Sequence, residues 1–163
     1  ACIEQASGSI KAAFSMGKDE EGAKLIAEAV KSDHENKTLQ MLARKVLADT
    51  GRANLAEELI DGAVKHCMSI IAEANALMRS AKPDESLARL EEALASMPEN
   101  TGVLLAAAQL HLLWMSQRGW NEEYVKRVRR YLATLDRLIP GNDRVAKMHK
   151  FLRDTLIKVA PKS

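Results

Sequence analysis

The sequence predicts an all-α protein built from antiparallel helix pairs. Alanine and leucine dominate over the β-branched residues typical of strands, and aromatic residues make up only 4% of the chain. Turn residues recur at comparable places, and the same order of small and large side chains follows each turn. These observations predict about four repeat-like helix pairs and a C-terminal capping helix, within one domain of 163 residues.

The helix pairs are delimited by turns that align when the chain is compared with itself. The four expected units and the capping helix span residues 3–36, 37–66, 67–100, 101–142 and 143–159. Gly17, Gly51 and Ala81 align at the turns within the first three units. Each unit boundary except the second carries an asparagine suited to cap the next helix, namely Asn36, Asn100 and Asn142.

The second helix after each of the first three turns repeats a small, large, small pattern of side chains. The positions are Gly22, Ile26 and Ala29, then Ala56, Ile60 and Ala63, and then Ser86, Leu90 and Ala93. Two antiparallel helices approach closely only where small side chains face each other, and the larger side chain fills the remaining gap. The pattern therefore predicts three similar helix–helix contacts.

The spacing of the units is uneven. Ala29 and Ala63 are 34 residues apart, whereas Ala63 and Ala93 are 30 apart. We therefore expect a shortened or a continuous helix around residues 64–69, where the second unit meets the third.

The last pair is longer than the usual period, because Pro98 and Pro140 are 42 residues apart. This spacing predicts an insertion of about eight residues. The insertion carries Trp114 and Trp120, which we expect to pin an elongated loop onto the helices.

Residues 67–98 resemble one complete tetratricopeptide repeat, a helix–turn–helix unit of about 34 residues. Counted from Cys67, the matching positions are Ile70, Ala74, Leu77, Ser86, Leu90, Ala93 and Pro98. Glu73 departs from the pattern, because the family usually has a large apolar residue there. The resemblance implies a right-handed superhelix of antiparallel helix pairs. It also implies a noncatalytic protein–protein interaction scaffold that binds a peptide or helix of a partner.

The same resemblance implies a binding groove formed mainly by first helices. The family's groove-facing positions correspond here to Met41, Lys45, Ala48, Met68, Ile71, Asn75, Met78, Leu105, Gln109 and Leu112. Asn75 stands where many family members carry an asparagine that bonds a peptide backbone. A groove with methionines suits an amphipathic helix, because methionine adapts to varied shapes. Alternatively, these methionines pack against the neighbouring repeat.

A narrower resemblance covers about residues 18–158. Its motifs are Val103-Leu104-Leu105-Ala106-Ala107-Ala108, Arg118-Gly119-Trp120, Arg129-Arg130-Tyr131-Leu132 and Ile139-Pro140-Gly141-Asn142. They are similar to the C-terminal repeat region of bacterial response regulators that join a receiver domain to tetratricopeptide repeats. This resemblance implies an output module of two-component signal transduction. Since the chain starts at Ala1 in helical pattern, we expect it to be a piece of a longer protein with the receiver domain upstream.

Charge is distributed unequally along the chain. Residues 1–100 hold 12 Lys and Arg against 17 Asp and Glu, whereas residues 101–163 hold 12 against 5. In the expected helix 121–138, a basic surface is formed by Lys126, Arg127, Arg129, Arg130 and Arg137. Such a surface could meet nucleic acid or an acidic protein. A solvated face is the simpler interpretation, and the lack of interleaved exposed aromatic residues disfavours nucleic acid.

The remaining residues predict neither an enzyme nor a cofactor or metal site. No phosphate-binding loop, nucleophile turn or acid–base cluster is found in the sequence. His66 and Cys67 are neighbours, but helical neighbours diverge by about 100° and no further ligand follows at metal spacing. Two distant cysteines, Cys2 and Cys67, are typical of a reducing cytoplasm.

No segment is long enough in apolar residues to predict a membrane span. The most apolar run, residues 103–115, is interrupted by Gln109 and His111, so we expect a buried helix with a structural histidine. An alternative to the scaffold function is a homo-oligomerisation module that uses an exposed apolar groove or Trp120 as its interface.

Overall fold

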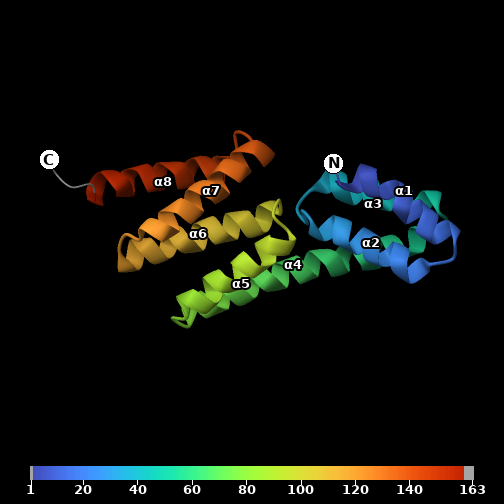
Figure 1. Cartoon of the computed structure of the whole chain (residues 1–163), viewed down its shortest axis with the longest axis horizontal. Helices are drawn as coiled ribbons and strands as arrows, with labels where there is room; N and C mark the ends of the chain where they lie inside the picture. Colours follow the sequence, from blue (N-terminus) through green and yellow to red (C-terminus); the bar gives the residue numbers. More distant parts are fainter. Residues whose placement is uncertain (1, 160–163) are drawn as a thin grey trace. The chain divides into compact units, whose positions relative to one another are not determined.

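The computed structural model describes residues 2–159, and these fold into helices with no strand among them (Figure 1). The elements are α1 Cys2–Ser15, α2 Asp19–Lys31, α3 Lys37–Asp49, η1 Ala53–Leu55, α4 Ala56–Arg79, α5 Pro83–Ser96, α6 Thr101–Arg118, α7 Glu122–Leu138 and α8 Asp143–Val159. The predicted all-α class is confirmed.

The chain divides into two compact units, Ala1–Ser69 and Ile70–Ser163. Helix α4 is 24 residues long and runs from the first unit into the second. Of the two alternatives expected around residues 64–69, the continuous helix is the one found. The predicted boundary between residues 66 and 67 therefore falls inside a helix, and the single-domain interpretation stays a prediction.

The three aligned turns share one backbone geometry. Gly17, Gly51 and Ala81 have φ angles of 72°, 74° and 57°, which lie in the left-handed region. At each turn this residue donates its N–H to the carbonyl three residues earlier, and the next residue donates to the carbonyl five residues before it. The pair of bonds is the Schellman motif, which satisfies carbonyls that the helix end leaves free. Alanine occupies the left-handed position only at the third of these turns.

The small, large, small positions are buried in all three second helices, as predicted. Gly22 shows why a small side chain is needed, because a Cβ atom there would lie 2.7 Å from ring atoms of Phe14. In the third helix pair, the Ser86 hydroxyl donates to the Ala74 carbonyl at 2.6 Å. Glu73 is accommodated by pointing to solvent, where its Oε2 accepts from Arg89 Nε at 2.9 Å.

Asparagine side chains begin four of the helices. In each case the Oδ1 atom accepts from the backbone N–H three residues later, which satisfies a donor at the helix start. These residues are Asn36, Asn100, Asn121 and Asn142. The three caps predicted at unit boundaries are confirmed.

The predicted elongated loop around the tryptophans is wrong. Helix α6 has 18 residues and α7 has 17, against 14 in α5, so the extra length lies in the helices. Only residues 119–121 connect α6 to α7. Trp114 lies under the Arg118 guanidinium, and Trp120 Nε1 donates to Glu122 Oε1 at 2.8 Å. Both tryptophans therefore make local contacts at the ends of helices.

Helix α6 is the centre of the second unit. It is apolar around nearly its whole circumference: residues 101–115 are buried except for Gln109, Leu113 and Trp114. Helix α7 packs extensively along α6, while α8 contacts both α6 and α7 over a smaller surface (Figure 1). Residues 143–159 form the expected last helix, and this arrangement leaves part of α6 beside α8 uncovered.

Candidate binding groove between α6 and α8

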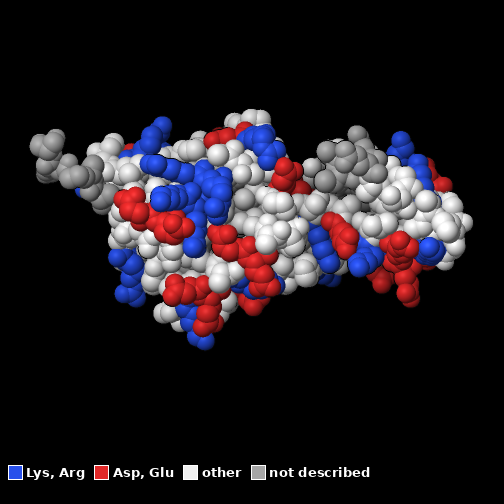
Figure 2. Space-filling model, in the orientation of Figure 1, with Lys and Arg blue, Asp and Glu red and all other residues white. Residues whose placement is uncertain are grey.

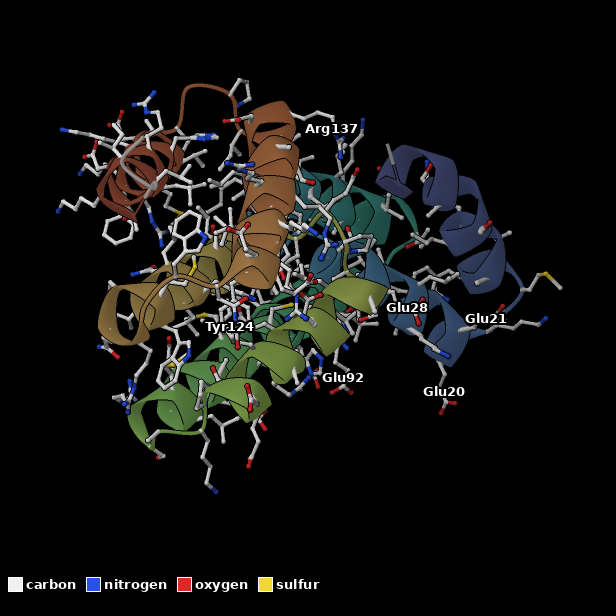
Figure 3. All side chains as sticks on the ribbon, turned by 60° about the vertical axis from the view of Figure 1, so that its left-hand side comes forward. Glu20, Glu21, Glu28, Glu92, Tyr124 and Arg137 are labelled. Atoms are coloured by element: carbon white, nitrogen blue, oxygen red, sulfur yellow. The ribbon has the colours of Figure 1, made fainter. Side chains whose placement is uncertain are left out.

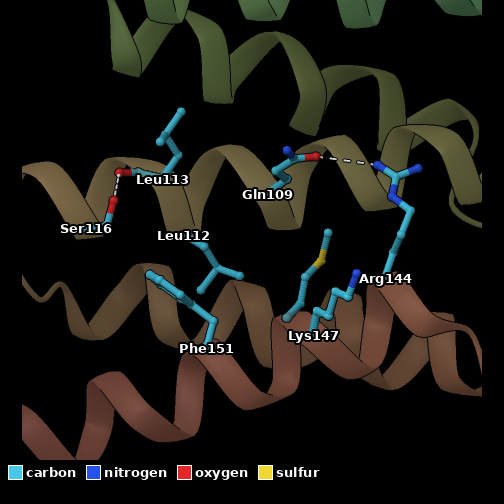
Figure 4. A pocket seen from close by; sticks show the side chains of 8 residues that line it. Gln109, Leu112, Leu113, Ser116, Arg144, Lys147 and Phe151 are labelled. Atoms are coloured by element: carbon cyan, nitrogen blue, oxygen red, sulfur yellow. Dashed lines mark hydrogen bonds between the residues drawn. The ribbon is translucent and has the colours of Figure 1, made fainter.

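Helices α6 and α8 border an open groove with a volume of about 360 Å³. We call it the α6–α8 groove. It is lined by Gln109, Leu112, Leu113, Ser116, Arg144, Lys147, Met148 and Phe151. Figure 4 shows the α6 residues of this set along one helix and the α8 residues along the other. The groove lies wholly within the second unit.

On the α8 side of the groove, one apolar side chain stays exposed beside the buried stripe of the helix. Val145, Met148 and Leu152 are buried at helical spacing, which fixes α8 on the unit. Phe151 lies beside this stripe and stays 40% exposed. The sequence predicts a capping helix here, and Phe151 adds an exposed apolar residue on the side of α8 that borders α6.

The α6 side offers a matching apolar surface. Leu112 is buried, whereas its neighbour Leu113 is 41% exposed. Exposed Leu and Phe side chains are ordinary when single, but here they border the same groove together with the buried Leu112 and Met148. The result is a continuous apolar surface across two helices.

Polar side chains lie at the two ends of the groove. At one end, Arg144 Nη2 donates to Gln109 Oε1 at 3.4 Å, a long and therefore weak hydrogen bond (Figure 4). At the other end, the Ser116 hydroxyl donates to the Leu113 carbonyl at 2.7 Å. No Asp or Glu is among the lining residues. Within residues 2–159, neither Arg144 nor Lys147 forms an ion pair, so the groove carries uncompensated positive charge.

The structure places only two of the residues expected in a peptide groove, Gln109 and Leu112, in the α6–α8 groove. Met78 and Leu105 are buried and therefore contribute to packing. For Met78 this agrees with the alternative that the methionines pack within the protein. Ile71 and Asn75 are half-buried on α4. The remaining predicted positions are exposed in the first unit: Met41 at 66%, Met68 at 57%, and Lys45 and Ala48.

The sequence reasoning missed Arg144, Lys147 and Phe151, because it treated residues 143–159 only as a cap. A signal was present: Phe151 is a large apolar residue at the edge of the buried stripe of α8. Cationic residues one and two turns before it mark the same side of the helix.

The predicted basic surface on α7 is largely compensated by glutamates. Arg137 Nη2 lies 2.9 Å from Glu99 Oε1, near the end of α7 (Figure 3). Arg130 Nη2 lies 3.7 Å from Glu91 Oε1, and Arg127 Nε lies 3.5 Å from Glu123 Oε1.

Lys126 and Arg129 are exposed on the same helix. Lys and Arg side chains gather over this part of the unit, but Asp and Glu lie directly beside them (Figure 2). Three of the five cations of the predicted basic surface thus have a glutamate within 4 Å, and Lys126 and Arg129 have no ion-pair partner among the described residues.

Beneath α7, His111 is buried on the expected buried helix, but its Nε2 atom has no hydrogen-bond partner among the described residues. Its side chain is fully buried, and Nδ1 lies 2.6 Å from the Ala107 carbonyl. The imidazole meets the rings of Tyr124 and Tyr131 edge to face, at centroid distances of 5.1 and 5.4 Å. Burial lowers the pKa of His111 from 6.5 to about 4, and the nearby Arg127 and Arg130 lower this pKa as well. The ring is therefore neutral at pH 7.

A second, smaller pocket of about 310 Å³ lies among α5, α6 and α7. Glu91, Arg130 and Tyr131 are among its lining residues. Glu91 Oε1 and the Tyr131 hydroxyl are buried there, and neither has a hydrogen-bond partner among the described residues. The Arg130 guanidinium lies 3.7 Å from Glu91 Oε1 and offsets the charge of this carboxylate.

The described part of the chain contains no group of three or more His, Cys, Asp and Glu that could hold a metal ion. Among the same residues, no helix is both long enough and apolar enough to cross a membrane. Comparison with known proteins finds no matching family model, no matching curated protein and no matching solved structure. The resemblance to tetratricopeptide repeats therefore rests on the residue positions given above and stays a prediction.

Proposed function

We propose that this chain is a noncatalytic interaction module that holds a helical segment of a partner protein in the α6–α8 groove. The observation that carries the proposal is the exposure of Leu113 and Phe151 beside the buried Leu112 and Met148. Water at such a surface is released when apolar side chains of a partner cover it, and this release favours binding.

The dimensions of the groove support a helix as the bound element. Its volume of about 360 Å³ lies at the lower end of the range for ligand pockets and accepts a few anchoring side chains. The groove is bordered by two helices, and an amphipathic helix can insert apolar residues spaced by one helical turn into such a groove. The methionine and the phenyl ring in its lining are residue types enriched at protein interfaces.

The repeated Schellman turns and the buried small, large, small positions support a wider proposal. In it, the chain is a tetratricopeptide-like right-handed superhelix in the cytoplasm, and α6 and α8 are first helices that face its binding groove. Following the narrower resemblance, the module would be the output part of a bacterial response regulator. It would recruit a protein partner when an upstream receiver domain changes state.

Two other functions receive less support. Nucleic-acid binding by α7 is disfavoured because Arg127, Arg130 and Arg137 each lie within 4 Å of a glutamate. Homo-oligomerisation would need a second copy to offer an apolar surface that fits the α6–α8 groove. Sedimentation at several protein concentrations measures this directly, because a self-associating module gains mass with concentration.

The proposal is tested by selecting helical peptides from a displayed random library against the full chain. We expect enriched sequences with apolar residues at helical spacing, and at least about tenfold weaker binding of these peptides to a Phe151→Glu variant. Ile157→Glu is the matched control, because Ile157 is a 76% exposed residue of α8 outside the groove.

Circular dichroism of both variants checks that the fold is retained, which the exposure of both side chains predicts. Failure to enrich any peptide, or equal loss of binding in both variants, would reject the groove as the interaction site.

A further inference from the structure

We infer that the α6–α8 groove is built for an amphipathic helix whose apolar stripe is bordered by Asp and Glu. This inference rests on the proposed function and names the chemistry of the partner. It is carried by the positive charge that the groove leaves uncompensated.

The charge of the groove is of one sign. Its two ionic lining residues, Arg144 and Lys147, are both cations. Both are exposed, and neither has an ion-pair partner within residues 2–159. On neighbouring α7, by contrast, three arginines have glutamate partners. Acidic residues of this unit thus pair with three of the five α7 cations and with neither cation of the groove.

The positions of these cations define where an acidic partner would place its carboxylates. Arg144 and Lys147 are three residues apart, which separates them by about 4.5 Å along the helix axis. Carboxylates spaced by three or four residues on a partner helix would meet them one turn apart. The weak bond from Arg144 to Gln109 is easily exchanged for a two-point contact between guanidinium and carboxylate.

The apolar lining distinguishes this partner from a nucleic acid. A nucleic acid held by Arg144 and Lys147 would leave Leu113 without an apolar partner. Platforms for single strands stack successive bases on several aromatic rings, whereas Phe151 is the only aromatic side chain among the lining residues. An amphipathic helix satisfies both the apolar lining and the cations at its edge.

A second copy of the chain fits the groove less well. Helices α2 and α5 are amphipathic and carry several acidic residues each. Their apolar stripes are already used, because Ile26 on α2 and Leu90 on α5 are fully buried. Either helix would have to leave its own unit to enter the groove, so a separate acidic segment is the better occupant.

The inference is tested with two capped peptides of about 18 residues each, long enough for several helical turns. Both carry the same leucines and phenylalanine at helical spacing. The residues that border this stripe are glutamate in one peptide and lysine in the other. Their affinities for the full chain are measured by fluorescence anisotropy at low and high salt, together with a short fluorescent single-stranded DNA.

We expect the acidic peptide to bind about tenfold more tightly than the basic one at low salt, with a smaller difference at high salt. In an Arg144→Glu/Lys147→Glu variant the order of the two peptides should reverse. The matched control is Lys126→Glu/Arg129→Glu, which makes the same change in net charge at exposed residues of α7 outside the groove. Its effect should be no larger than about threefold, because distant exposed charges are screened.

The outcomes separate this inference from the proposed function. Equal binding of both peptides, with loss in Phe151→Glu, would overturn the acidic partner and retain the groove. The same conclusion would follow if neither peptide bound while the library selection still enriched others. Tighter binding of DNA than of the acidic peptide, lost in the Arg144→Glu/Lys147→Glu variant, would overturn the inference in favour of nucleic acid. Failure of the library selection itself would reject the proposed function.

Discussion

Helices α7 and α8 have similar sequence composition but differ in how much of their apolar and charged surface is covered. Each has 17 residues, five of them Lys or Arg, and each packs an apolar stripe against α6. On α7 the stripe is fully covered and three arginines face glutamates. On α8 the apolar surface extends to the exposed Phe151, and no Lys or Arg has an ion-pair partner among the described residues. The number of cations on a helix therefore does not indicate how many are available to a partner.

The largest expected difference between the two helices is in stability. Leu132→Ala on α7 removes a fully buried side chain and should lower the free energy of unfolding by about 2–5 kcal/mol. Leu152→Ala on α8 removes a leucine that is 5% exposed from a helix with a smaller contact surface, and should cost less. Urea denaturation followed by circular dichroism measures both changes. An equal or larger loss in Leu152→Ala would show that α8 is as firmly packed as α7.

Acid should weaken the α7 side of α6 through His111. The folded protein holds this imidazole neutral with a pKa of about 4, against 6.5 when unfolded. Below pH 6.5 the unfolded chain binds the proton first, so the free energy of unfolding falls as the pH drops from 6.5 to about 4. The loss amounts to about 3 kcal/mol, from about 1.36 kcal/mol for each unit of pKa.

The control for this prediction is His111→Phe, which keeps a ring between Tyr124 and Tyr131 and removes the titration. Denaturation curves of both proteins across this pH range give the difference. A parallel decline in the two proteins would exclude His111 as the cause.

Charge reversal should act in opposite directions on the two helices. Arg137→Glu breaks the contact with Glu99 and places a negative charge in the last turn of α7, so it should cost about 0.5–1 kcal/mol of stability. Arg144→Glu places the same charge in the first turn of α8, where the helix dipole favours it, and should be neutral or stabilise by about 0.3 kcal/mol. Thermal melts at low and high salt measure both, and both effects should shrink with salt. Equal destabilisation by the two substitutions would contradict the comparison.

The smallest expected change in stability concerns the hydroxyl of Tyr131, a buried residue of α7. Because this buried group has no hydrogen-bond partner among the described residues, Tyr131→Phe should change stability by no more than about 0.5 kcal/mol, neutral or stabilising. Differential scanning calorimetry is precise enough to detect this change. A loss above about 1 kcal/mol would show that the hydroxyl is satisfied in solution, for instance by bound water.

The sequence was sufficient for features that depend on neighbouring residues. The turns at Gly17, Gly51 and Ala81, the asparagine caps and the buried small, large, small positions follow from local backbone preferences and side-chain size. The continuous helix through residues 64–69 was one of two alternatives, because no proline or glycine interrupts the chain there. These patterns recur in several of the helix pairs.

The candidate site could not be predicted in the same way. The groove depends on how α8 meets α6, and the pairing of Arg137 with Glu99 joins residues 38 positions apart. No local pattern encodes either relation. The prediction that the extra residues of the last helix pair form a loop was also wrong, because extra residues in a helix and in a loop change the spacing equally. Residues 119–121 form a short connection even though the whole pair is long.

The alanine in the third Schellman turn gives the second unit a defined place at which to open. Ala81 adopts a left-handed backbone that glycine accepts freely and that costs an L-residue about 1 kcal/mol. The amides closing this turn, on Ala81 and Lys82, should therefore exchange with deuterium sooner than their counterparts at Gly17 and Gly51. Local opening at this turn would fray the end of α4 and the start of α5 while the buried core of α6 stays protected.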